Sequence, residues 1–101
     1  MSRRLRYLGS AQNDIRGIVR YIATQAGNRD AGSDFGTKLQ ERCKRIAQLP
    51  GILGTTRPDI SSDLRSMLFQ AYVIYFRYHD GDVEIVNVLH ASFDAEAHFH
   101  G

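Results

Sequence analysis

The segment VLHASFD, residues 88–94, places a histidine and a carboxylate four residues apart at the end of an apolar run. A histidine has an ordinary pKa close to neutrality, so His90 could act as a general base. The alternative is a structural role, in which Asp94 accepts a hydrogen bond from His90, from Arg65 or from a backbone N–H. Asp94 would then hold the C-terminal segment against the last strand.

For two of the arginines in the second half of the chain, a structural role and a functional role are again both possible. A guanidinium tolerates partial burial when it binds a carboxylate with two hydrogen bonds. Arg57 and Arg65 could therefore fix the surrounding loop through Asp59, Asp63 or Asp94. The functional hypothesis is that both arginines contact a protein partner.

A metal site is not expected from the remaining candidate ligands. His98 and His100 lie two residues apart, and only His90 or Asp94 could join them. A zinc site needs more convergent ligands than this. Cys43 lies on or beside the apolar stripe of a predicted helix, which favours a core residue over a nucleophile. We predict neither a metal nor a cofactor.

Length and composition favour one small globular domain covering residues 1–101. The chain is 43% hydrophobic, which is enough for one modest core. It has no run of 18 apolar residues, no apolar segment typical of a signal peptide, and a single cysteine. We therefore expect a soluble cytoplasmic protein with no membrane association.

Charge is divided unevenly along the chain. Residues 1–50 contain ten Lys and Arg against four acids, whereas residues 51–101 contain three against seven. Such a division attracts an acidic partner, either nucleic acid or an acidic protein segment. The alternative is that the basic residues only keep the surface helices soluble.

The first half of the chain predicts one strand and two helices. Residues 3–8 alternate charged and apolar side chains, as a half-buried strand does. Ser10 is the expected N-cap of a helix that ends at Gly27, and Asp14 should favour its positive end. A second helix is expected from Asp30 to Pro50, in which glycines could allow close approach of the first helix.

The second half predicts a loop followed by strands. Residues 50–63 contain both prolines and are expected to cross the body of the protein. Asp80-Gly81 predicts a two-residue type I′ hairpin turn. Strict alternation would place Val83, Ile85, Asn87 and Leu89 on one face of the last strand. The tail could form a short helical turn.

The predicted fold class is α+β, with the order β-α-α-β-β-β. An antiparallel helix hairpin should pack on one face of a mainly antiparallel sheet. Residues 3–8 should pair with one strand of the later hairpin.

Five segments follow one another along the chain in a characteristic order. They are SAQNDIRGIVRYIATQAG, LPG after the second helix, Gly54-Thr55-Thr56-Arg57, Leu64-Arg65 and YVIYFRYHDGDVEIVNVLH. Together they resemble the RelE/ParE superfamily of bacterial toxins, and the resemblance extends from about Leu5 to Asp94.

The superfamily contains two functional classes on one fold, so the resemblance alone does not choose between them. RelE-like toxins are ribosome-dependent mRNA endonucleases, whereas ParE-like toxins poison DNA gyrase. Metal-free RNA cleavage needs a base, cations beside the phosphate and an acid for the leaving oxygen. Here Arg65 stands where such a cation would stand, but the loop has no lysine and no tyrosine follows Tyr78.

The ParE-like class is the better match, because a VLH…D ending of the last strand is common in it. The resemblance therefore implies a toxin that inhibits DNA gyrase by binding, without catalytic residues. His90 and Asp94 are interpreted as structural. The alternative is a RelE-like mRNA endonuclease that uses His90 and Arg65.

The resemblance also implies partners. A ParD-like antitoxin, acidic and partly disordered, would wrap the toxin and would carry the binding to operator DNA. Six arginines are the expected contacts with the target or the antitoxin. They are Arg16, Arg20, Arg42, Arg45, Arg57 and Arg65.

Overall fold

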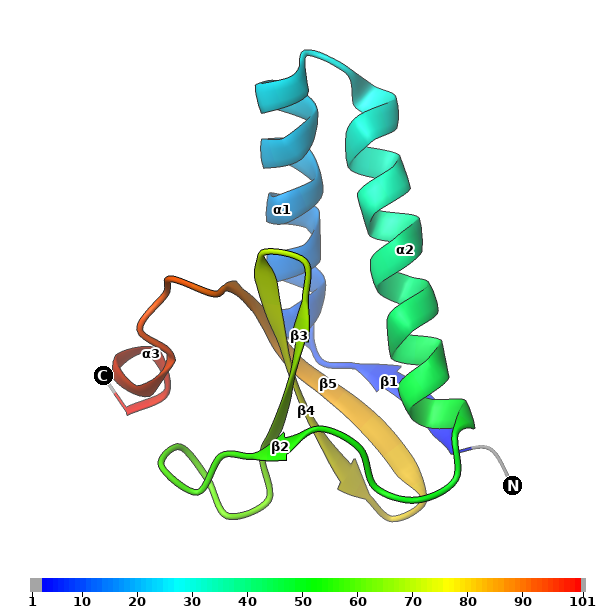
Figure 1. Cartoon of the computed structure of the whole chain (residues 1–101), viewed down its shortest axis with the longest axis vertical. Helices are drawn as coiled ribbons and strands as arrows, with labels where there is room; N and C mark the ends of the chain where they lie inside the picture. Colours follow the sequence, from blue (N-terminus) through cyan, green and yellow to red (C-terminus); the bar gives the residue numbers. More distant parts are fainter. Residues whose placement is uncertain (1–2, 101) are drawn as a thin grey trace.

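The computed structural model describes residues 3–100, which form a single sheet, a long helix hairpin and a short C-terminal helix (Figure 1). The elements are β1 (Arg4–Tyr7), α1 (Gly9–Ala26), α2 (Arg29–Gln48), β2 (Thr55–Thr56), β3 (Arg65–Phe69), β4 (Tyr72–His79), β5 (Asp82–His90) and α3 (Ala95–His100). This α+β order confirms the predicted one, to which the structure adds the two-residue strand β2.

The five strands lie in the order β1-β5-β4-β3-β2. β1 pairs with β5, as expected for residues 3–8, and this pair is parallel. The other neighbouring strands are antiparallel, so the sheet is mixed. A parallel pair needs a long crossover connection, and here the helix hairpin forms part of it.

The turn between β4 and β5 has the predicted geometry. Asp80 has a φ of 49° and Gly81 a φ of 81°, and a type I′ turn requires positive φ at both positions. The turn brings together the two longest strands, which form the centre of the sheet.

β5 contains a β-bulge at Val86, because adjacent residues of β4 pair with Ile85 and Asn87. The extra residue reverses the alternation of side chains. Beyond the bulge Val88 joins the core beneath the helices, and Leu89 joins the core of the opposite face. The prediction of strict alternation along this strand is therefore wrong beyond Ile85.

α1 begins two residues earlier than predicted, at Gly9, and its N-cap is Leu8. The predicted cap, Ser10, lies inside the helix, and its hydroxyl donates to the backbone oxygen of Val86. The prediction fails because the Ser10 hydroxyl binds the carbonyl group of the bulge residue in β5 instead of a backbone N–H of its own helix.

Asp14 also has a different role from the predicted one at the positive end of the helix. Its Oδ2 accepts hydrogen bonds from Asn87 Nδ2 at 2.8 Å and from the backbone N–H of Val88 at 3.0 Å. β1 ends at Tyr7, which pairs with Ile85, so on the β1 side this part of β5 has no strand beside it within residues 3–100. Asp14 therefore satisfies an edge group of β5 and holds α1 against the sheet.

The two long helices pack closely near the turn that joins them. Gly27 ends α1 with a φ of 64°, and the side chain of Asn28 caps α2. A Cβ at Gly32 would lie 2.5 Å from the backbone oxygen of Val19, and one at Gly36 would lie 3.2 Å from a methyl of Val19. The glycines thus allow the close approach, as predicted.

Both faces of the sheet are covered over part of their area. The larger core lies between the sheet and the helix hairpin, and Leu39, Ile74 and Phe76 are fully buried in it. A smaller core on the opposite face joins Tyr75 and Leu89 to the loop before β3 and to α3. Within residues 3–100, none of the helices is both long and apolar enough to span a bilayer.

Candidate binding surfaces

The four arginines predicted on the helices do not form one patch. Arg16 lies on α1 at a notch between the two helices, and Arg20 is exposed one turn further on. Arg42 and Arg45 lie on the opposite side of α2, beside β3. The structure therefore divides the predicted basic surface into two separate sites.

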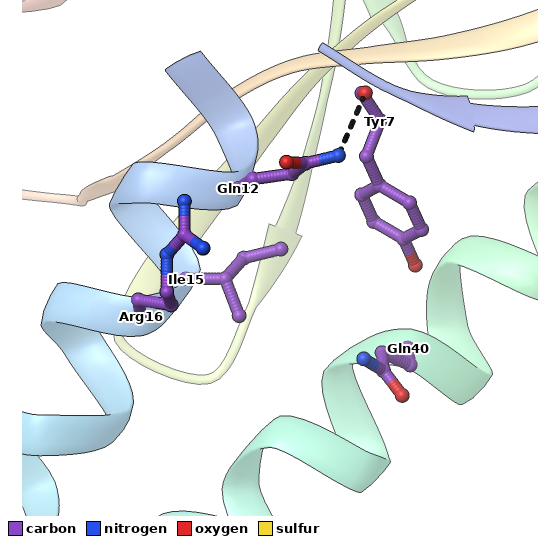
Figure 2. Close-up of a pocket in the computed structure, with 5 residues that line it drawn as sticks. All are labelled: Tyr7, Gln12, Ile15, Arg16 and Gln40. Carbon is purple, nitrogen blue, oxygen red and sulfur yellow. Dashed lines mark hydrogen bonds between the residues drawn. The ribbon is translucent and has the colours of Figure 1, made fainter. Parts of the chain in front are cut away.

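The first site is the hairpin notch, a hollow of about 320 Å³ lined by residues of α1, α2 and β1 (Figure 2). These residues are Tyr7, Gln12, Ile15, Arg16 and Gln40. In Figure 2 the ring of Tyr7 reaches from β1 into the space between the helices, opposite Ile15. The notch lies towards the sheet, away from the glycines at which the helices approach each other.

Two hydrogen bonds position the polar side chains of the hairpin notch. The Gln12 amide donates from Nε2 to the backbone oxygen of Tyr7, at 3.4 Å. Arg16 donates from Nη2 to Asn13 Oδ1, at 2.8 Å. Arg16 is the one charged side chain in the lining, so the notch presents hydrogen-bond donors and a positive charge.

The hydroxyl of Tyr7 is buried and forms no hydrogen bond of ordinary geometry within the described chain. Its neighbour is the thiol of Cys43, a weak hydrogen-bonding group. Burial raises the pKa of Tyr7 and raises that of Cys43 to about 11. Both groups are therefore neutral near pH 7, and Cys43 is a fully buried core residue, as its position on the apolar stripe indicated.

The second site is the β3 groove, a hollow of about 530 Å³ between α2, the following loop and β3. Its lining residues are Arg42, Arg45, Ile46, Leu49, Leu53 and Met67. The lining combines two positive charges with four apolar side chains and includes no acid. The guanidinium of Arg42 also lies over the ring of Phe69, 5.2 Å from its centroid.

The β3 groove lies beside an open edge of the sheet. β2 pairs only with Arg65 and Ser66, so the outer edge of β3 from Met67 to Phe69 has no strand beside it within residues 3–100. Leu68, in the middle of this stretch, is 64% exposed. Such an edge can accept an extended segment of another chain.

Arg57 forms contacts within the loop that carries it. Its Nε and Nη2 donate to the carboxylate of Asp59, at 3.1 and 2.9 Å. The guanidinium also lies over the ring of Tyr75, 5.6 Å from the centroid. The pair lowers the pKa of Asp59, chiefly through the hydrogen bond from Arg57.

Arg65 binds backbone carbonyl groups rather than the carboxylates considered from the sequence. Its Nε donates to the oxygen of Leu53 at 2.7 Å, and its Nη2 donates to that of Gly54 at 3.0 Å. The side chain therefore fastens the loop after α2 to the edge of the sheet.

His90 and Asp94 form separate local contacts and no hydrogen bond with each other. His90 Nδ1 accepts from the backbone N–H of Ser92 at 3.1 Å, and the Ser92 hydroxyl lies 2.7 Å from the same nitrogen. Asp94 accepts from the backbone N–H of Ala97 at 3.0 Å and so caps α3. Of the three donors considered for Asp94, the backbone N–H is the one observed.

The candidate metal ligands considered from the sequence were His98, His100, His90 and Asp94. No group of three or more potential ligands converges among residues 3–100. His100 instead places its Nε2 3.1 Å from the backbone oxygen of Asp59.

Sequence reasoning missed a set of paired charges on the face of the sheet opposite the helices. The Glu84 carboxylate accepts from Arg77 Nε at 2.7 Å and from Arg6 Nη1 at 3.3 Å. Asp82 binds Arg4 through two hydrogen bonds. A signal was present, because Arg4 and Arg6 alternate along β1 as the two acids do along β5, but the parallel register was needed to match them.

Sequence reasoning also missed the two amides of the hairpin notch. Gln40 lies on the flank of α2 that faces α1, whereas Arg42 lies on the flank that faces β3. A helical wheel of α2 separates these flanks. The hollow itself depends on how the helices diverge, which periodicity does not specify.

Comparison with known proteins identifies the family of this chain. Residues 5–95 match the family described as ParE toxin of type II toxin–antitoxin system, parDE. The chain therefore belongs to the ParE toxin family.

A solved structure shares the fold. It is a chain of the structure titled "Chromosomal ParDE TA system from P. aeruginosa", with a TM-score of 0.74 and 16% sequence identity. The alignment covers 88% of the present chain and 96% of that chain. No curated protein matches the sequence.

Proposed function

We propose that this toxin inhibits DNA gyrase by binding it, without chemistry of its own, and that a ParD-like antitoxin neutralises it. The toxin would act in the cytoplasm, and operator DNA would be bound only through the antitoxin. Membership of the ParE family supports the toxin class.

The proposal that the toxin has no catalytic activity is supported chiefly by the distance between the two candidate nuclease residues, His90 and Arg65. His90 pairs with Tyr72 and Arg65 pairs with Phe76, so their positions are four residue steps apart along β4. At about 3.3 Å per residue, this corresponds to roughly 13 Å along the strand. Arg65 is also held by two backbone carbonyl groups, so the two side chains are poorly placed to act on one phosphate.

The experiment is a pair of assays on the purified toxin. One measures supercoiling and cleavage complexes of DNA gyrase, and the other measures mRNA cleavage on programmed ribosomes. We expect inhibition of gyrase and intact mRNA. Cleaved mRNA with normal gyrase activity would overturn the proposal in favour of the RelE-like alternative.

The β3 groove is the best candidate for the antitoxin. An acidic segment with apolar side chains would place its acids beside Arg42 and Arg45 and its apolar groups beside Leu49, Leu53 and Met67. An extended part of the same segment could pair with the open edge of β3. Ile52, in the loop that borders the groove, is 62% exposed and would add apolar area.

Two neighbouring charge reversals test this placement. Arg45 lines the β3 groove, whereas Lys44 is exposed and lies outside it. We expect Arg45→Glu to weaken antitoxin binding by about tenfold and Lys44→Glu to change it by less than about twofold. The measurement is the dissociation constant by calorimetry at fixed salt. Equal effects of the two variants would place the antitoxin elsewhere.

A further inference from the structure

The hairpin notch offers hydrogen-bond donors that the toxin itself does not satisfy. The hydrogen bond to Asn13 occupies one nitrogen of Arg16. Gln40 forms no side-chain hydrogen bond within the described chain, and no carboxylate lines the hollow. A guanidinium and a free amide beside an apolar wall form a receptor for a carboxylate on an aliphatic stem.

Size and charge favour a single side chain of a protein over other ligands. A volume of about 320 Å³ is near the lower limit for small-molecule sites, and the notch is open to solvent. Nucleic acid is held by several cations along its backbone, whereas Arg16 is the one charged residue of this lining. Ile15 and the ring of Tyr7 would contact the aliphatic part of an Asp or Glu side chain.

The notch lies on the other flank of α2 from the β3 groove. Gln40 faces α1, and Arg42 and Arg45 face β3. An antitoxin segment in the β3 groove would therefore leave the lining of the notch uncovered. A different protein can use this second surface.

We propose that the hairpin notch receives an acidic side chain from an exposed segment of DNA gyrase. This inference rests on the proposed function and specifies where on the toxin the target binds. Arg16 supplies the charge, Gln40 supplies a second donor, and the ring of Tyr7 forms one wall.

The test compares Arg16→Glu with Arg29→Glu, a matched reversal on an exposed arginine at the other end of the hairpin. Three quantities are measured for each variant: the concentration that half-inhibits gyrase supercoiling, the dissociation constant for the antitoxin, and the circular dichroism spectrum. We expect Arg16→Glu to raise the half-inhibitory concentration by at least about tenfold, with antitoxin affinity within about twofold of wild type. Arg29→Glu should change neither.

A second variant, Gln40→Leu, removes the free amide with little change of shape. It should weaken gyrase inhibition by about threefold, and it should not weaken antitoxin binding.

The outcomes separate this inference from the proposed function. If the wild-type toxin inhibits gyrase and Arg16→Glu inhibits it equally well, the placement in the notch is overturned and the function stands. If Arg16→Glu loses antitoxin binding while it still inhibits gyrase, the notch belongs to the antitoxin. If the wild-type toxin leaves gyrase unaffected, the function and this inference fail together.

Discussion

The arginines of the sheet and the arginines of the helix hairpin differ in their partners. The sheet arginines are Arg4, Arg6, Arg65 and Arg77, and each binds a carboxylate or a backbone carbonyl group. The helix arginines are Arg16, Arg20, Arg29, Arg42 and Arg45, and none forms an ion pair within residues 3–100. The same residue type therefore serves the fold in one region and is available to partners in the other.

The cause of the difference is geometric. Neighbouring strands place side chains side by side, so Arg6 and Glu84 meet through the register of β1 and β5. In Figure 1 the turn end of the helix hairpin extends beyond the sheet. Arg16, Arg42 and Arg45 line open hollows, so no acid of a paired strand lies opposite their charges, which can meet solvent or another protein.

The largest effect that tests this comparison is expected at Arg65. Arg65→Ala removes two hydrogen bonds that hold the loop at Leu53 and Gly54, and it should lower the free energy of unfolding by about 2 kcal/mol. Arg45→Ala should change it by less than about 0.5 kcal/mol, because Arg45 is exposed and unpaired within the described chain. Urea unfolding of both variants measures the difference. If both variants lost the same free energy of unfolding, the sheet arginines and the helix arginines would not differ in their contribution to the fold.

A smaller effect, confined to acid pH, is expected at Glu84. Its side chain is only 7% exposed, and the hydrogen bond from Arg77 lowers its pKa. A lowered pKa in the folded state stabilises the fold above the ordinary pKa of the group, and this stabilisation is lost as the pH falls through the folded value. The free energy of unfolding should therefore fall between about pH 5 and pH 2, and less steeply in Glu84→Gln.

The control for this pH dependence lies on the hairpin. Glu41 is exposed on α2 and forms no ion pair within residues 3–100, so Glu41→Gln should follow the wild-type curve. If the free energy of unfolding fell more steeply with decreasing pH in Glu84→Gln than in the wild type, the paired charges of the sheet would not stabilise the fold.

The smallest effect on stability is expected at Tyr7, in the wall of the hairpin notch, and here the substitution should stabilise the fold. Tyr7→Phe removes a buried hydroxyl that has no hydrogen-bond partner, so it should raise the free energy of unfolding by up to about 1 kcal/mol. Gyrase inhibition should not change, because the ring remains. Thermal unfolding followed by circular dichroism is the measurement, and a lower melting temperature would indicate a hydrogen bond to Cys43.

The sequence predicted the fold well where local chemistry determines it. The Asp80-Gly81 turn, the end of α1 at Gly27 and the alternation along β1 each depend on residues close in the chain. The bulge at Val86 was not predictable, because nothing in its neighbours distinguishes it from a regular strand residue.

The candidate sites were predicted less well, because their partners lie far apart in the chain. Asp14 binds groups 73 and 74 residues away, and the register that brings them together is a property of the whole sheet. In the same way, Arg57 and Arg65 look alike in the sequence, although one binds Asp59 and the other binds carbonyl groups.

The most direct test of the proposed function is to measure gyrase supercoiling and ribosomal mRNA cleavage side by side for the wild-type toxin and His90→Ala. His90 contacts Ser92 and Tyr72 at the end of β5, so its loss should leave binding to gyrase intact. The proposed function predicts that both proteins inhibit gyrase at similar concentrations and that neither cleaves mRNA. Wild-type cleavage of mRNA that His90→Ala abolishes would contradict it.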